Sequence, residues 1–325
     1  MTGTATGSTT FTPLAEEHLD GAAILLAARH AAGRRVEPAL DPRYEEPAAA
    51  RQEIASLLRR DAASGAAAVR DGEVLGYVLG VPLEETWGPN VWVEPAGHAV
   101  AGPELVRDLY AAAAARWVEE GRTSHYAVVP TTDPELVDAW FRLGFGHQHV
   151  HAIREPLETP PTAPEGIVLR RARREDIDAL VRAELSLGEH QLLSPVFSGA
   201  RLSTVEETRA EWDEDFDDPK YTTFVAERDG TVLGSAIGCA IELSSMHRSL
   251  ALPVGAGFLG FAAVLPEHRG LGAGRLLGEA VLSWAHEAGY PAVATDWRMT
   301  NLLSSRTWPR LGFRPTFYRL FRAIA

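Results

Sequence analysis

A glycine-rich turn that opens into a helix is the stretch whose residues could do chemistry. Residues 264–277 read VLPEHRGLGAGRLL, with an apolar run before Pro266 and an amphipathic helical pattern after the glycines. Such a turn presents backbone N–H groups at the positive end of a helix dipole, which suits a phosphate. Glycines let the phosphate approach the backbone, and Arg269 adds charge at the mouth. We expect a phosphate-bearing ligand here; a turn that only reverses the chain is the alternative.

The turn does not match two common nucleotide patterns. It lacks the Gly-Lys-Ser/Thr ending of a P-loop, which argues against hydrolysis of a nucleoside triphosphate. Arg275 stands where a dinucleotide fingerprint has its third glycine, and no acidic residue ends a suitable following strand, which argues against NAD.

Two segments resemble the GCN5-related N-acetyltransferase (GNAT) family. Residues 269–274, RGLGAG, resemble its R-x-x-G-x-G/A pyrophosphate loop, and residues 301–313 resemble its N-x-x-A-x-x-x-Y-x-x-x-G-F segment. The resemblance implies acetyl-CoA as cosubstrate, no metal, and direct acetyl transfer to a small amine. The pantetheine arm would pair with the strand before the loop, and the pyrophosphate would rest on the loop amides. The cofactor-binding residues so implied are Phe261, Ala262, Ala263, Val264, Arg269, Gly270, Leu271, Gly272, Ala273, Gly274, Arg275, Asn301 and Ser304.

The catalytic groups depart from that family. Trp308 stands where the family often has a tyrosine that protonates the leaving thiolate. Tyr318 is a candidate substitute, with packing in a sheet as its other interpretation. Glu242 and Asp296, each at the end of an expected strand, are candidate general bases or solvated strand ends. We expect His247, in an irregular segment, to be exposed.

The chain repeats itself, which predicts two copies of one domain. RDGEVLGYVLG at 70–80 recurs as RDGTVLGSAIG at 228–238, and WFRLGF at 140–145 recurs as WPRLGF at 308–313. The pattern of hairpins and helices predicts an α/β fold class: two tandem GNAT domains, each a mixed, mostly antiparallel sheet flanked by helices. The expected ranges are a disordered lead at 1–10, a degenerate copy at 11–154, a proline-rich linker at 155–166 and a catalytic copy at 167–325.

The first copy is expected to have lost the cofactor loop. Aligning 93–105 with 264–276 puts His98 opposite Arg269, Ala101 opposite Gly272 and Pro103 opposite Gly274; Asp133 falls opposite Asn301. Proline has no N–H to offer a phosphate. We predict a structural role for this copy; a divergent CoA site is the alternative.

Composition narrows the partners and the location. The net charge of −13 argues against nucleic acid and anionic membranes. The acidic run 206–218 would suit a cationic acceptor, or is a solvated helix face. Cys239 is the single cysteine and lies in an apolar run, so we interpret it as a core residue. With no signal peptide in the polar start, a cytoplasmic location is expected.

Three histidines alternate on an expected strand: His147, His149 and His151. They share one face, and we interpret them as surface residues in preference to a metal site. Two function classes stay open beside the N-acetyltransferase: a non-catalytic acyl-CoA-binding or regulatory protein, and a transferase of a longer acyl or aminoacyl group. The acceptor and the oligomeric state are not readable from the sequence.

Overall fold

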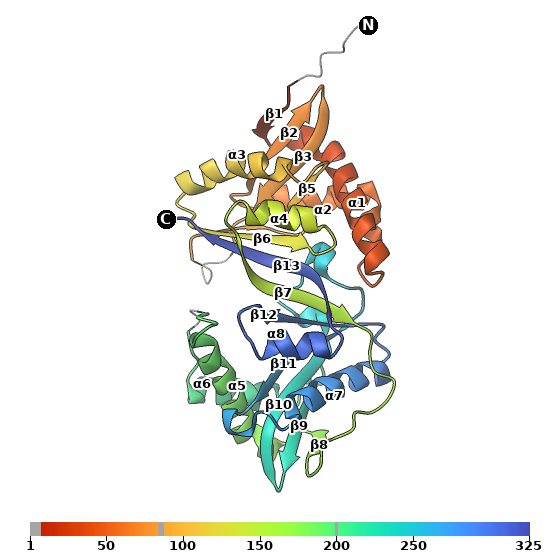
Figure 1. Cartoon of the computed structure of the whole chain (residues 1–325), viewed down its shortest axis with the longest axis vertical. Coiled ribbons are helices and arrows are strands. Elements are labelled where there is room, and N and C mark those ends of the chain that lie inside the picture. Colours follow the sequence, from red (N-terminus) through yellow and green to blue (C-terminus); the bar gives the residue numbers. More distant parts are fainter. Residues whose placement is uncertain (1–7, 84–87, 199–200) are drawn as a thin grey trace. The chain divides into compact units, whose positions relative to one another are not determined.

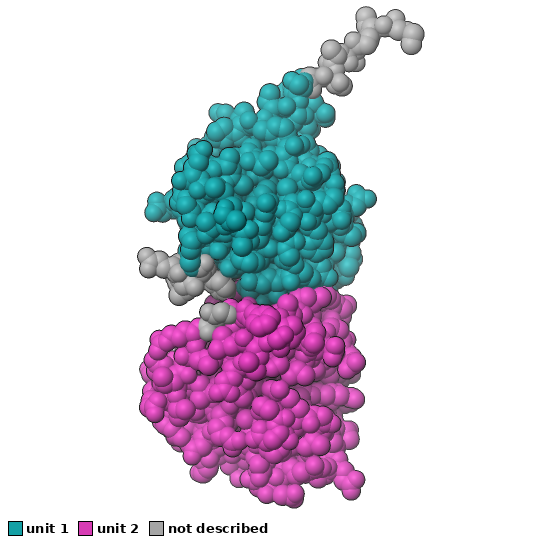
Figure 2. All heavy atoms as spheres, turned by 60° about the vertical axis from the view of Figure 1, so that its left-hand side comes forward, with its two compact units in different colours: residues 1–149, 248–252, 316–325 teal, residues 150–247, 253–315 magenta. Residues whose placement is uncertain are grey.

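The chain forms two compact units (Figure 2), and the computed structural model describes residues 8–83, 88–198 and 201–325. Unit 1 comprises residues 1–149, 248–252 and 316–325; unit 2 comprises residues 150–247 and 253–315. The boundary between the units therefore does not coincide with the boundary between the two sequence copies. The end of the first copy belongs to unit 2, and the end of the second copy belongs to unit 1.

Unit 1 holds two sets of strands, in the orders β1-β2-β3-β5 and β4-β6-β13. The β2–β3 hairpin turns at Asp71 and Gly72, which have φ of 52° and 82° as a tight hairpin turn requires. The strands of unit 1 are β1 Thr10–Pro13, β2 Ser64–Arg70, β3 Glu73–Gly80, β4 Asn90–Val93, β5 His98–Val100, β6 Ser124–Pro130, β7 Gly146–Arg154 (to residue 149) and β13 Arg314–Ala323 (from residue 316).

The helices of unit 1 bury the apolar faces of these strands. Trp117 of α3 and Trp140 of α4 are almost fully buried among aliphatic residues of β2, β3, β4 and β6. The helices and 3-10 turns are η1 Glu16–His18, α1 Leu19–Val36, η2 Pro42–Glu45, α2 Pro47–Leu58, α3 Leu105–Glu119, α4 Pro134–Phe141 and η6 Ser249–Ala251.

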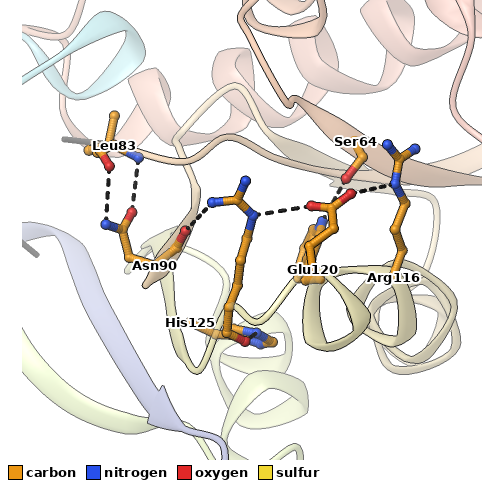
Figure 3. A network of polar contacts seen from close by, with 8 residues as sticks. Ser64, Leu83, Asn90, Arg116, Glu120 and His125 are labelled. Carbon is orange, nitrogen blue, oxygen red and sulfur yellow. Dashed lines mark hydrogen bonds and ion pairs between the residues drawn. The ribbon is translucent and has the colours of Figure 1, made fainter. Parts of the chain in front are cut away.

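Polar contacts fix the ends of these elements (Figure 3). The Asn90 side chain accepts from the N–H of Leu83 and donates to its carbonyl, at 2.9 and 3.1 Å. Trp117 Nε1 donates to Ser64 Oγ at 3.0 Å. Arg122 donates to Glu120 and to the Asn90 carbonyl, so β4 is tied to the end of α3.

Unit 2 holds strands in the order β7-β12-β11-β10-β9-β8, with α5 and α7 packed against them (Figure 1). The β9–β10 hairpin turns at Asp229 and Gly230, with φ of 51° and 76°, as the Asp-Gly pair predicted. The strands are β7 (from residue 150), β8 Val168–Arg171, β9 Thr222–Arg228, β10 Thr231–Ala240, β11 Gly257–Val264 and β12 Val293–Arg298. The helices and turns are η4 Arg174–Asp176, α5 Ile177–Leu192, α6 Val205–Asp215, η5 Ile241–Leu243, η7 Pro266–His268, α7 Ala273–Glu287 and α8 Ser304–Arg310.

The N-terminal lead, the proline-rich stretch and the single cysteine were also predicted from the sequence. The expected lead at 1–10 lies outside the described residues up to residue 7, and Thr10 already begins β1. The proline-rich stretch 155–166 forms no helix or strand. Cys239 is buried, as predicted, and burial raises the pKa of its thiol to about 11. Among helices of the described residues, none combines the length and apolarity needed to cross a bilayer.

Candidate active site

Strands β11 and β12 pair for a short distance and then separate. Their parallel register joins Gly257 to Val293 and ends with Leu259 opposite Thr295. β11 continues to pair with β10 on its other side as far as Val264. The Thr295 hydroxyl donates to the Leu259 carbonyl at 3.0 Å, so the fork ends in a satisfied hydrogen bond. Beyond Leu259, β11 has no further pairing with β12 in the described part of the chain.

A bulge at Gly260 turns the strand over at the fork. Ile237 of β10 pairs with Phe261 and Gly238 with Leu259, so Gly260 is the extra residue. Before the bulge, Gly257 lies against Ala285 and Tyr290; after it, Val264 lies against Gly274 of α7. The bulge therefore places Val264 on the same side of β11 as Gly257, facing α7.

The glycine turn leaves its amides open. Gly272 caps α7 at φ 88°, a left-handed conformation that favours glycine. The first backbone bond of the helix runs from Leu276 N to the Gly272 carbonyl at 3.1 Å. Within the described part of the chain, no backbone or side-chain acceptor receives the N–H groups of residues 270–275. Arg269 donates from Nε to the Val264 carbonyl at 3.3 Å, which holds its charge at the mouth.

These elements line one cavity of about 700 Å³ inside unit 2. That volume lies within the range of small-molecule sites. Of the residues predicted to bind cofactor, the cavity is lined by Ala262, Ala263, Val264, Arg269, Gly270, Gly272, Ala273, Gly274, Arg275, Asn301 and Ser304. Phe261 instead packs beside the buried Ala183, Ala263 and Leu265, and Leu271 is exposed.

Helix α5 supplies lining residues that the sequence analysis missed. Ser186, Leu187 and His190 follow one another at helical spacing and face the cavity. His190 Nε2 lies 3.2 Å from Asn301 Oδ1, and the same oxygen accepts from Leu303 N, so Asn301 is held in place. The spacing of these residues on α5 was a visible signal, but nothing in the sequence indicated which face of the helix meets the cavity.

The far end of the cavity is formed by α7, α8 and the start of the linker. Gly278 lets α8 approach α7, because a Cβ there would lie 2.6 Å from Leu311 and 3.0 Å from Trp308. Arg154 donates to the Leu311 carbonyl. The remaining lining residues are Arg154, Leu157, His268, Leu277, Glu279, Leu303, Thr307, Trp308, Arg310 and Leu311. Arg275 pairs with Glu279 at 2.7 Å, so its charge is shared within the helix.

The three candidate catalytic residues lie in different surroundings. Asp296 is the first residue of β12 beyond the fork, and its carboxylate is largely buried. Glu242 is exposed in η5; burial raises the pKa of Tyr290, and the Glu242 charge adds to that effect. Tyr318 belongs to unit 1, where it pairs with Val129 of β6 and its ring lies 3.9 Å from that of His147. Asp296 alone of the three follows the last β11–β12 pair, and none of the three is among the residues that line the cavity.

The expectation that His247 is exposed was wrong. Its side chain is buried, its ring lies 4.5 Å from that of His151 with the ring planes tilted by 49°, and it contacts Phe258 edge-on. Nδ1 lies 2.9 Å from Ser244 Oγ and 3.9 Å from Asp296 Oδ2. Burial lowers the pKa of His247, and the nearby Asp296 charge opposes that effect. The irregular segment is therefore a packed loop, which local sequence does not reveal.

The acidic run behaves as a solvated helix. The carboxylates of α6 are exposed, while Thr204 and Glu207 form a capping box at its start. Arg209 pairs with Asp178, and Trp212 donates to the half-buried Glu184 at 2.7 Å. Burial raises the pKa of Glu184. Of the two interpretations of this run, the structure favours the solvated face.

The register of unit 1 corrects the alignment of the two loops. Gly76 and Gly234 occupy the same place in the repeat; Gly76 pairs with Val100, and Gly234 pairs with Val264. Val100, and not Val93, is therefore the counterpart of Val264. His98 then corresponds to Ala262. From these strands to the next helix, unit 1 has only residues 101–104, four residues, where unit 2 has residues 265–272, eight residues.

The shortened connection of unit 1 closes its amides. Leu105, Val106 and Arg107 donate to the carbonyls of Gly102, Pro103 and Glu104, respectively, at 3.1 to 3.2 Å. The start of α3 is therefore internally satisfied, unlike that of α7. The prediction that this loop is degenerate rests on a shortening of the chain as well as on Pro103.

Two side chains fill the fork of unit 1. His98 is fully buried, and its Nε2 lies 3.0 Å from the Val128 carbonyl, just past the last β4–β6 pair at Val93 and Ala127. Arg29 of α1, in the place of Leu187 in the repeat, donates to the carbonyls of His98 and Pro95. Burial lowers the pKa of Arg29 to about 10 and that of His98 to about 3. An arginine and a histidine thus occupy the place of two cavity-lining residues.

The expectation that the three strand histidines are surface residues was wrong for two of them. His149 and His151 are buried, and His149 Nδ1 lies 2.9 Å from an Arg319 guanidinium nitrogen. Among the described residues, no group of three or more His, Cys, Asp or Glu could hold a metal ion.

The part of the chain that holds most of the cavity matches a known family. Residues 190–313 match the model of the acetyltransferase (GNAT) family. Residues 190–313 are a GNAT domain. The segment includes β11, the glycine turn and Asn301, so the cavity lies in the GNAT domain and is completed by residues from α5 and the linker.

Solved structures extend the likeness of fold to the whole chain. A GCN5-related N-acetyltransferase from Sphaerobacter thermophilus is 18% identical with a TM-score of 0.56, over 97% of this chain and 95% of that one. A tandem GNAT protein from the clavulanic acid biosynthesis pathway is 19% identical with a TM-score of 0.49, over 97% of each chain. No curated protein matches. The predicted α/β fold with mixed sheets flanked by helices is confirmed, and the family match covers residues 190–313.

Proposed function

We propose that this protein is an acetyl-CoA-dependent N-acetyltransferase of a small-molecule amine, with its active site in unit 2. The observation that carries the proposal is the set of open amides at residues 270–275, beside a strand that has separated from its neighbour. The amides and Arg269 suit the pyrophosphate of a CoA thioester. The edge of β11 from Ala262 to Val264 suits the amide groups of its pantetheine arm.

The order of these groups sets the direction of the bound thioester. The pyrophosphate would lie at the start of α7, and the pantetheine arm would run along β11 toward the fork. The thioester carbonyl would then lie near Asp296, which follows the last β11–β12 pair. We propose Asp296 as the general base for the acceptor amine, in preference to the exposed Glu242.

The leaving thiolate needs little help from the protein. Trp308 lines the cavity and has no acidic proton to give. A thiol with a pKa of about 8.5 is a tolerable leaving group, and water can protonate it after departure. The contribution of the protein is to position the two reactants and to remove a proton from the amine.

The test measures release of free CoA from acetyl-CoA in the presence of spermidine, glucosamine, kanamycin and free amino acids. Turnover with at least one of these amines, abolished in Gly274→Pro, is expected. Tight binding of acetyl-CoA with no turnover on any amine would favour a non-catalytic acyl-CoA-binding protein. If free CoA is released faster from hexanoyl-CoA than from acetyl-CoA, this would favour a transferase of longer acyl groups.

A further inference from the structure

A buried histidine stands behind the carboxylate at the fork. His247 Nδ1 lies 3.9 Å from Asp296 Oδ2 and 2.9 Å from Ser244 Oγ. Ser244 Oγ also accepts hydrogen bonds from the backbone N–H groups of Met246 and His247, with N···O distances of 3.3 Å. The turn of this loop thereby aims Nδ1 at the serine hydroxyl and the carboxylate.

The rest of the imidazole is enclosed without a polar partner. The ring packs between His151 of β7 and Phe258 of β11, and its exposed fraction is 4%. Within the described part of the chain, Nε2 has no hydrogen-bond partner. A buried polar atom left unsatisfied costs about 1–3 kcal/mol. Packing alone would be served better by an apolar ring, so this imidazole calls for a role beyond packing.

We infer that His247 and Asp296 act together as a proton-accepting pair for the acceptor amine, with His247 as the positioning residue that takes up the proton from Asp296. The inference rests on the proposed function. The groups that face His247 are Asp296 of β12, His151 of β7, Phe258 of β11 and Ser244 of its own loop.

The acceptor enters as an ammonium ion and gives one proton to the Asp296 carboxylate. The freed lone pair forms the N–C bond at the thioester carbonyl, and collapse of the tetrahedral intermediate breaks the C–S bond, with the electron pair leaving on sulfur. The second N–H proton neutralises the thiolate. The proton on Asp296 moves to His247 Nδ1, which leaves a carboxylate and an imidazolium, and is later released to water.

Holding the proton on a histidine makes the pair a better base than a lone carboxylate. A carboxylate with an ordinary pKa of about 4 holds a proton only briefly, whereas an imidazole, with an ordinary pKa of about 6.5, can hold it longer. Burial lowers the pKa of His247 and so opposes proton uptake, whereas the Asp296 charge raises that pKa. The negative charge of Asp296 then stabilises the imidazolium.

The test compares Asp296→Asn and His247→Asn with wild type in the CoA-release assay with spermidine, glucosamine and kanamycin. Asp296→Asn should lower kcat about 100-fold or more, and His247→Asn about 10-fold, within the usual range for acid–base groups. The dissociation constant for acetyl-CoA, measured by calorimetry, should stay within about twofold of wild type. The acid limb of the kcat profile should move to lower pH in His247→Asn, because a carboxylate then titrates without its partner.

A readout without acceptor keeps this test independent of the proposed function. In ¹⁵N-histidine NMR, Asp296→Asn should lower the pKa of His247, because the carboxylate that favours its protonation is gone. An unchanged acid limb in His247→Asn, or an unchanged His247 titration in Asp296→Asn, would overturn the inference. Wild type that neither binds nor turns over acetyl-CoA would instead overturn the proposed function.

Discussion

The helices that follow the central strands, α3 in unit 1 and α7 in unit 2, are both 15 residues long but begin differently. Helix α7 follows an eight-residue connection with a left-handed glycine cap, and its first amides are open. Helix α3 follows a four-residue connection, and its first amides bond to the preceding turn. The length of the connection thus differs between the two units together with the bonding of the first helix amides.

The strand forks beside these helices also differ: that of unit 2 borders a cavity, and that of unit 1 is filled by side chains. In unit 2 the small side chains of Ala262 and Ala263 and the apolar Leu187 leave a cavity. In unit 1 His98 and Arg29 fill the corresponding place and bond to the backbone there. The backbone groups that a ligand could satisfy in unit 2 are satisfied internally in unit 1. The carbonyls of Pro95, His98 and Val128 are thereby paired in unit 1 without a ligand.

Replacing Arg29 should have the largest effect. Arg29→Met leaves the buried carbonyls of His98 and Pro95 without a donor, at about 1–3 kcal/mol each, and removes the cost of burying a charge. We expect the free energy of unfolding to fall by about 2–4 kcal/mol in urea denaturation. Acetyl-CoA binding should not change.

The matched control is Arg51→Met, at an exposed arginine paired with Asp20, which should change stability by no more than about 0.5 kcal/mol. If Arg29→Met matched this control, Arg29 would not be what completes the unit 1 fork. A gain of a second acetyl-CoA equivalent in Arg29→Met would mean that the short loop does not prevent binding.

The buried His98 should make unit 1 sensitive to acid. The pKa of His98 is about 3 in the folded chain and 6.5 ordinarily, so below pH 6.5 the unfolded chain binds the extra proton and stability falls with falling pH. This group contributes a slope of about 1.4 kcal/mol per pH unit between about pH 6 and 4. His98→Gln keeps a donor for the Val128 carbonyl but does not titrate. The free energy of unfolding of this variant should therefore fall less steeply with falling pH, by about that slope.

Chemical denaturation at several pH values measures these slopes. His286→Gln, at an exposed histidine of α7, serves as the control and should run parallel to wild type. A His98→Gln curve that is also parallel to wild type would show that His98 takes up a proton in the folded chain, and therefore that the fork of unit 1 opens to water.

Removing the charge at the mouth of unit 2 should have a smaller effect, confined to binding. Arg269→Gln should raise the dissociation constant of acetyl-CoA about 10-fold at low salt, because one charge-assisted contact to phosphate is lost. The difference should shrink at high ionic strength, since Arg269 is exposed. Arg107→Gln, beside the corresponding loop of unit 1, is the matched control and should bind as wild type; equal losses in both variants would contradict the assignment to unit 2.

Features encoded locally could be predicted from the sequence. The Asp-Gly hairpins, the glycine turn, the helix after it and the duplication all follow from neighbouring residues or from direct repetition. Most of the predicted cofactor-binding residues line one cavity for the same reason, because they lie on one strand, one turn and one helix start.

Features set by distant contacts could not be predicted. The burial of His247 depends on packing against β7 and β11, and the pairing of β13 with β6 joins residues almost 200 positions apart. The alignment of the two loops failed because a shortened connection leaves no trace in residue identities. Strand register exposes it, since each pairing position fixes its neighbours.

The central claim is that one of the two copies binds acetyl-CoA, through the amides at the start of α7. Its most direct test is calorimetric titration of acetyl-CoA into wild type, Gly274→Pro and the unit 1 control Gly102→Pro. Proline at the second position of α7 removes an amide that has no partner in the described part of the chain, and the first turn of a helix tolerates proline. We predict one equivalent for wild type and for Gly102→Pro, and none for a folded Gly274→Pro. Two equivalents in wild type, or one equivalent retained by Gly274→Pro, would contradict the account.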